Sequence, residues 1–147
     1  MLIKLLPDQI PQFWEAIKYA AVKAEGVEEE NIPYYVNNLL YMLLSNKATC
    51  LVKLNNERKF IGLTIVQVVN DEARNGLTMF QRVVYAYESS SLDDWKDTIK
   101  EFKKFAISLG CKYWSGWASN EQMAKICELA GGKRQATQYV IKLDGGV

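Results

Sequence analysis

Hydrophobic side chains recur along this chain with two different periods, and the period changes where predicted helices give way to predicted strands. From Ile10 to Glu25 the apolar positions follow helical spacing, and Gly26 supplies a stop signal. A second helix is predicted for residues 34–45, because Pro33 suits a first helical turn. Apolar residues cover most of the circumference of this second helix, so we expect it to be largely buried.

The middle of the chain is rich in β-branched and aromatic residues, with turn-forming residues between the runs. This composition predicts three consecutive antiparallel strands after a short opening strand. The predicted strands cover residues 1–6, 48–54, 60–69 and 77–88. The turn before the last of them closes on Asn75-Gly76, a dipeptide typical of tight hairpins.

A long amphipathic helix is predicted to follow these strands and to end at Gly110. Its apolar stripe consists of Leu92, Trp95, Ile99, Phe102, Ala106 and Leu109. A strand at residues 111–118, a helix between Asn120 and Gly131, and a final strand at residues 138–143 complete the pattern. We therefore expect an α+β (mixed α/β) fold. It would form one domain over residues 1–147, with a central, mostly antiparallel twisted sheet flanked by about four helices.

Composition narrows the possible partners. Eighteen basic and seventeen acidic residues leave a formal net charge of +1, so no general field attracts nucleic acid or an anionic membrane. The longest apolar-rich stretch, residues 34–44, is too short to span a bilayer. We expect no nucleic-acid or membrane partner, and a protein partner recognised through local contacts, with the oligomeric state left open.

The absence of histidine excludes Ser-His-Asp and Cys-His nucleophile systems and the commonest metal ligand. The three cysteines, Cys50, Cys111 and Cys127, are far apart and have no short metal-ligand spacing. Disulfides and a metal site are therefore not expected, and a reducing, cytoplasmic location fits best. Any catalysis would have to use carboxylates, Tyr, Cys or Lys.

The last predicted helix carries a spacing that points to one family. Asn120, Met123, Ile126 and Gly131 fall on the pattern Asn-x-x-Ala-x-x-Leu-Tyr-x-x-x-Gly. With the order of elements, this resembles the GCN5-related N-acetyltransferase (GNAT) fold over nearly the whole chain. In that family the tyrosine of the pattern often protonates the leaving thiolate of coenzyme A. Cys127 stands at that position, so the resemblance makes it a candidate acid, although we favour an inert core thiol.

The family's glycine-rich cofactor motif is missing where the resemblance places it. Its conserved positions fall on Ser90, Asp93 and Trp95. Family members bind the pyrophosphate of acetyl-CoA through backbone amides at a helix start, where glycine keeps side chains out of the way. Here Trp95 is bulky, Asp93 and Asp94 are negative, and Ser91 with Asp94 reads as a self-capped helix start.

Some residues could still support the chemistry if coenzyme A binds. Ser89, Ser90 and Ser91 could offer hydroxyls and amides to phosphate in place of glycines, with Asn120 as a further cofactor contact, although we favour ordinary N-capping. Glu88, at the predicted strand end, could be a general base toward a substrate amine, although a solvated carboxylate is the simpler interpretation.

Two functions follow from the resemblance. We favour a GNAT-like protein with a degenerate acyl-CoA site and no cofactor, acting as a non-catalytic binding or assembly component. Small proteins of this kind look similar to some encoded by phages, including virion-associated ones. The alternative is an acyl-CoA-dependent N-acyltransferase with a divergent pyrophosphate loop, which would use acetyl-CoA.

Overall fold

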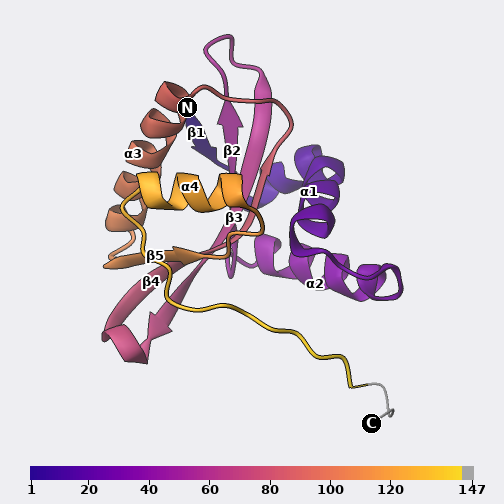
Figure 1. Ribbon diagram of the computed structural model, residues 1–147. Helices are drawn as coiled ribbons and strands as arrows, with labels where there is room; N and C mark the ends of the chain where they lie inside the picture. The colour runs from indigo at the N-terminus through magenta and orange to yellow at the C-terminus, as the bar shows by residue number, and fades with distance from the viewer. Residues whose placement is uncertain (144–147) are drawn as a thin grey trace. The chain divides into compact units, whose positions relative to one another are not determined.

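Five strands, arranged in chain order, form the sheet of this protein (Figure 1). They are β1 (Leu2–Lys4), β2 (Thr49–Leu54), β3 (Phe60–Asp71), β4 (Gly76–Ala86) and β5 (Tyr113–Gly116). Neighbours from β1 to β4 pair antiparallel, and β5 pairs parallel to β4. The sheet is therefore mixed and mostly antiparallel, as the sequence predicted.

Four α-helices accompany the sheet. They are α1 (Ile10–Glu25), α2 (Ile32–Leu44), α3 (Leu92–Ser108) and α4 (Glu121–Leu129). Short 3-10 turns lie at Pro7–Gln9, Glu29–Asn31 and Glu72–Arg74. Gly26 ends α1 with a φ of 59°, a left-handed conformation that glycine adopts without strain. The predicted α+β fold class is confirmed.

The computed structural model describes residues 1–143 of the chain. These belong to two compact units, Met1–Trp117 and Ala118–Val147. The first unit holds the whole sheet with α1, α2 and α3, and the second holds α4. Within the described part, no helix is both long and apolar enough to cross a membrane.

Alternation along the strands divides the first unit into two hydrophobic layers. On one face of the sheet, Cys50 and Val52 of β2 pack with residues of α1 and α2. On the other face, Leu51 packs with Phe102 and Ala106 of α3. Successive side chains of a strand point to opposite faces, so a single strand serves both layers. Figure 1 shows the same arrangement, with α3 on the opposite side of the sheet from α1 and α2.

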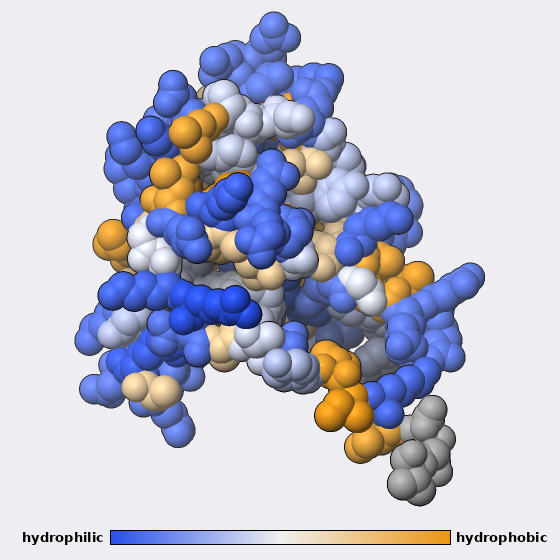
Figure 2. All heavy atoms as spheres, viewed as in Figure 1, coloured by the Kyte–Doolittle hydropathy of each residue, from blue (hydrophilic) through white to orange (hydrophobic). Residues whose placement is uncertain are grey.

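The strand predicted at residues 138–143 is wrong. This segment makes no strand pairing in the described residues, and its apolar side chains are exposed; Tyr139, Val140, Ile141 and Leu143 are all at least 80% accessible. Figure 2 shows apolar side chains along this segment, beside the residues drawn in grey. The β-branched composition favoured a strand, but a strand needs a hydrogen-bonding neighbour to form.

The prediction that the second helix is largely buried is also wrong. Only Leu39 and Leu43 of α2 are fully buried. The opposite side of the helix leaves Tyr34, Tyr41 and Leu44 exposed, although α2 contains no charged residue. A helix that is apolar all round predicts burial, but the first unit covers only one side of this one.

Candidate cofactor site at the start of helix α3

The loop between β4 and α3 is where the sequence places the cofactor motif, and its end is capped by its own residues. Ser91 is the N-cap of α3, and its Oγ accepts a hydrogen bond from the backbone amide of Asp94 at 3.1 Å. The amide of Trp95 donates to the backbone oxygen of Ser91 at 3.0 Å. The predicted cap by Ser91 is therefore confirmed: its hydroxyl occupies the amide of Asp94, which has no partner within the helix, and the Trp95 amide makes the first regular helical bond.

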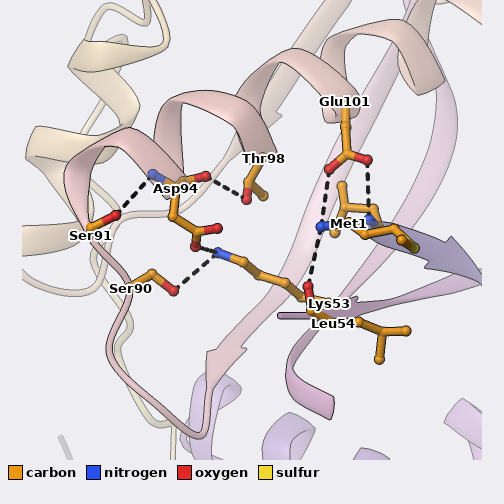
Figure 3. Close-up of polar contacts among 9 residues, drawn as sticks. Met1, Lys53, Leu54, Ser90, Ser91, Asp94, Thr98 and Glu101 are labelled. Atoms are coloured by element: carbon orange, nitrogen blue, oxygen red, sulfur yellow. Dashed lines mark hydrogen bonds and ion pairs between the residues drawn. The ribbon is translucent and has the colours of Figure 1, made fainter. Parts of the chain in front are cut away.

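A buried lysine from the sheet reaches this helix start (Figure 3). Lys53 lies on β2 with its side chain 8% exposed, and its Nζ is 2.6 Å from Oδ2 of Asp94. The same ammonium donates to Oγ of Ser90 at 3.1 Å and lies 4.4 Å from the centroid of the Trp95 ring. The Lys53 ammonium thus contacts the loop at Ser90 and the first turn of α3 at Asp94 and Trp95. Its charge is compensated inside the protein by Asp94.

The electrostatics of Asp94 follow from this pairing. Desolvation acts to raise the pKa of the Asp94 carboxyl, but hydrogen bonds from Lys53 and Ser90 and the charge of Lys53 outweigh it and lower the pKa. Asp94 therefore stays ionised near neutral pH, at the positive end of the helix dipole. Trp95 is half-buried with its ring against Lys53, which gives it a structural role in place of the glycine that the family motif has there.

The helix is also tied to the sheet further along. Glu101 of α3 accepts a hydrogen bond from the backbone amide of Leu2 in β1 at 3.4 Å. Phe102 packs against Trp114 of β5, with ring centroids 4.5 Å apart. These contacts fix α3 along the face of the sheet on which Lys53 lies.

Strand β5 pairs with β4 over a short length. Their pairing runs from Thr78 opposite Tyr113 to Gln81 opposite Gly116, where β5 ends, and β4 continues to Ala86 paired with β3. The β3–β4 pairing has a bulge at the same level, because Ile65 pairs with Val83 and Val66 with Gln81, which leaves Arg82 without a partner on β3.

A chain of polar side chains links β3, β4 and β5 near the end of the β4–β5 pairing. Nε1 of Trp114 donates to Oε1 of Gln81 at 2.9 Å, and Nε2 of Gln81 donates to Oγ1 of Thr64 at 2.8 Å. The buried hydroxyl of Thr64 donates to the backbone oxygen of Val83 at 2.7 Å. The three side chains satisfy one another's hydrogen bonds, so this network stabilises the sheet where the β4–β5 pairing ends.

The bulged residue connects β4 to the helices on the other face. Nε of Arg82 lies 3.1 Å from a carboxylate oxygen of Glu25 at the end of α1, and the hydroxyl of Tyr35 in α2 donates to the same carboxylate. Desolvation, followed by the hydrogen bond to Glu25, raises the pKa of Tyr35. The phenol therefore stays neutral and acts as a donor that holds α1, α2 and β4 together.

Glu88 lies outside the strand, because β4 ends at Ala86 and not at residue 88 as predicted. Its carboxylate is exposed and paired with Nζ of Lys59 at 2.5 Å. Tyr87 turns away from it: the Tyr87 hydroxyl donates to the backbone oxygen of Ala16 at 2.6 Å, and its ring packs on Phe60. The aromatic rings of Tyr87, Phe60 and Tyr85 pack together beside Glu88, and the role of Glu88 as a base stays a prediction.

The other predicted site residues divide between the two units. Ser89, Ser90 and Ser91 follow one another in the first unit, whereas Asn120 and Cys127 belong to the second. Oδ1 of Asn120 accepts from the amide of Met123 at 2.8 Å, so its observed role is to cap α4. Cys127 is exposed. The core interpretation of this thiol is wrong because α4 turns it toward solvent, and its role as an acid stays a prediction.

Sequence reasoning missed Lys53, Thr64 and Gln81. Lys53 did leave a signal, since a lysine between Val52 and Leu54 interrupts an otherwise apolar strand and needs a partner if it is buried. Thr64 and Gln81 left none, because polar residues in strands usually face solvent. Among residues 1–143 no group of three carboxylate or thiol side chains is placed to hold a metal ion.

Comparison with known proteins identifies the fold. No family model matches the sequence, and no curated protein matches it significantly. Solved structures of several acetyltransferases are similar to this chain over nearly its whole length. A ribosomal-protein-alanine N-acetyltransferase from Brucella melitensis biovar Abortus 2308 has a TM-score of 0.68 at 14% identity, covering 97% of this chain and 99% of that one. An aminoglycoside acetyltransferase from an uncultured soil metagenomic sample, in complex with sisomicin, has a TM-score of 0.73 at 15% identity, covering 98% and 96%. A predicted acetyltransferase with acetyl-CoA from Clostridium acetobutylicum has a TM-score of 0.67 at 12% identity, covering 98% and 95%.

The chain therefore has a divergent GNAT-like fold, as its element order and the spacing after Asn120 predicted. At these identities the likeness shows the fold alone and leaves the activity open. The similarity to phage-encoded proteins stays a prediction.

Proposed function

We propose that this chain is a GNAT-like protein whose acyl-CoA site is degenerate and that it acts as a non-catalytic binding or assembly component, with a protein as its partner. The observation that carries the proposal is the occupied start of α3. Ser91 occupies the amide of Asp94, and Asp94 with Ser90 occupies the ammonium of Lys53, at a place where an anion would need free amides and free positive charge.

Charge supports the proposal. Asp94 neutralises Lys53, and the exposed Asp93 adds a further negative charge in the first helical turn. Each acidic side chain within about 4 Å of a phosphate costs roughly 1 kcal/mol in water and about 4 kcal/mol in a partly desolvated site. A diphosphate would therefore meet repulsion from Asp93, or would first have to break the buried pair.

Shape supports it as well. Glycine in a phosphate loop lets the backbone approach the ligand closely. Trp95 puts an indole ring at that position, and the ring is held against Lys53. Moving it would expose both the ring and the lysine stem, so the space is not opened by a simple rotamer change.

The test is to free the helix start and compare cofactor binding. The wild-type protein should show no thermal stabilisation by about 1 mM acetyl-CoA, since stabilisation requires a ligand concentration above the Kd. The double variant Asp93→Gly, Asp94→Ser removes both negative charges and frees Lys53, and it should gain measurable stabilisation. The matched control Asp97→Ser changes an exposed acid further along α3 and should gain none. Stabilisation of the wild type as large as that of the double variant would contradict the proposal.

One similar solved structure is described as containing acetyl-CoA, which supports a second candidate, an acyl-CoA-dependent N-acyltransferase. In this alternative, Ser89, Ser90 and Ser91 with Asn120 would hold the cofactor, Glu88 would be the base, and Cys127 or a water molecule would be the acid. Turnover of acetyl-CoA with an amine, abolished by Glu88→Gln but retained by Glu57→Gln on the exposed β2–β3 turn, would establish it.

A further inference from the structure

The exposed side of α2 is an uncharged surface of the first unit that the proposed function does not use. Residues 32–44 contain no Asp, Glu, Lys or Arg. Tyr34, Asn37, Asn38 and Tyr41 are spaced by three and four, so they lie on one face of the helix. All four are exposed, with Tyr34 at 80% and Tyr41 at 56%, and Leu44 extends the stripe by one more turn.

We propose that this stripe is a homodimer interface, in which α2 packs antiparallel against α2 of a second copy of this chain. The first argument is the order of the residues. The run from Tyr34 to Tyr41 reads Tyr-Tyr-Val-Asn-Asn-Leu-Leu-Tyr. It is symmetric at the four exposed positions: the tyrosines lie at equal distances from a midpoint between Asn37 and Asn38. A two-fold axis through that midpoint places Tyr34 opposite the Tyr41 of the other copy.

The second argument is the chemistry at the axis. A side-chain amide both donates and accepts hydrogen bonds, so Asn37 of one copy can pair with Asn38 of the other in either orientation. Asn38 makes one weak contact within its own chain, from Nδ2 to the sulfur of Met42 at 3.7 Å. A second copy would replace this contact with a stronger one.

The third argument is charge at the two ends of the stripe. Glu29 and Glu30 lie directly before α2, and Lys47 follows it. Nζ of Lys47 contacts Tyr41, at 3.1 Å from the hydroxyl and 4.8 Å from the ring centroid. In an antiparallel pair the acidic end of each helix meets the basic end of the other, so both ends attract.

The area is sufficient for a weak dimer. A covered tyrosine buries about 150–250 Å², so two tyrosines, two asparagines and a leucine offer on the order of 500 Å² per copy. The total of about 1,000 Å² is near the lower limit for a specific interface, so we expect a weak dimer. The inference does not depend on whether the start of α3 binds a cofactor.

The test is sedimentation of the full chain up to about 300 μM, a high concentration chosen because an interface of this size is expected to be weak. The wild type should form dimers. Asn37→Asp with Asn38→Asp brings four like charges to the axis and should give monomers. Asn37→Asp with Asn38→Lys places each Asp opposite a Lys of the other copy and should keep the dimer, because the change is complementary only under this symmetry. The control Ile107→Glu alters an apolar residue on α3 that is 71% exposed and should leave the dimer intact.

Circular dichroism of each variant checks that it is folded. We expect all of them to fold, because the substituted positions lie on the surface. A wild type that stays monomeric over the whole range would overturn the proposal. So would a dimer that survives the two aspartates or is lost with Ile107→Glu, since the interface would then lie elsewhere. Loss of the dimer in the Asp/Lys variant would overturn the two-fold register.

Discussion

The polar chain across β3, β4 and β5 and the start of α3 lie on the same face of one sheet, yet they are held in different ways. The polar chain joins side chains of neighbouring strands beside a bulge in the backbone pairing. The start of α3 is held by Ser91, Asp94 and Lys53, and the last of these comes from a distant strand. A ligand site that requires small side chains can therefore be closed by a few residues without a change in the fold.

Removing the acid at the start of α3 should have the largest effect on stability. Asp94→Ala leaves the buried ammonium of Lys53 with only Ser90 as a hydrogen-bond partner, and an unpaired buried charge is strongly destabilising. Because Asp94 itself is partly exposed, we expect a loss of about 2–3 kcal/mol, measured by urea unfolding. Asp93→Ala is the matched control and should change the unfolding free energy by less than about 0.5 kcal/mol. Equal effects of the two changes would show that Lys53 does not depend on Asp94.

The polar chain between the strands should rank next. Gln81→Leu removes the acceptor of Trp114 and the donor to Thr64, so two partly buried groups lose a partner. We expect a loss of about 2 kcal/mol in the same unfolding measurement. Gln67→Leu, on the neighbouring strand and half-buried without such a chain, should cost less. If Gln81→Leu left the unfolding free energy unchanged, these hydrogen bonds would not contribute to stability.

The N-cap of α3 should contribute less to the unfolding free energy than the Lys53–Asp94 pair or the polar chain. Ser91→Ala removes the acceptor of the Asp94 amide and should cost about 1 kcal/mol, whereas Ser91→Thr should keep most of the stability. Ser89→Ala, two residues earlier in the loop, is the control and should be neutral. A cost for Ser89→Ala equal to that for Ser91→Ala would contradict the assignment of Ser91 as the N-cap.

The contribution of the buried pair should also depend on pH in one direction. The folded pKa of Asp94 lies below its unfolded value, so the stabilisation is fully present above the unfolded pKa of about 3.9 and is lost as pH falls through the folded pKa. The difference in unfolding free energy between wild type and Asp94→Asn should therefore be constant near neutral pH and shrink below about pH 4. A difference that persists unchanged at low pH would show that the pair is not ionised.

Thiol labelling does not measure stability, but it counts the cysteines that react in the folded protein. Burial raises the pKa of Cys50 to about 12 and also raises that of Cys111, so neither forms a reactive thiolate in the folded protein. Cys127 is exposed. One thiol should react in the native state and three after unfolding, with Cys127→Ser removing the native signal.

The sequence predicted the helices well because each carries its own stop and start signals. Gly26 after α1, Ser91 before α3 and Asn120 before α4 are local chemistry, readable without the rest of the fold. The strand at residues 138–143 could not be excluded in the same way, since a strand depends on a neighbour that the local sequence does not specify.

The candidate site was predicted in part. The bulky and acidic residues at Asp93, Asp94 and Trp95 indicated that the glycine loop is missing, but they predicted only repulsion of a phosphate. The partner that neutralises Asp94 is Lys53, about forty positions away in the sequence, and no local pattern joins the two. Long-range pairing between a strand and a helix start is what sequence reading could not supply.

The most direct test of the closed helix start is a calorimetric titration of acetyl-CoA into the wild-type protein. A closed helix start predicts no saturable heat at cofactor concentrations up to about 1 mM, because Lys53 is already paired with Asp94 and the amide of Asp94 with Ser91. A one-to-one binding curve with a micromolar Kd, weakened by substitutions at Ser90 and Ser91, would contradict it.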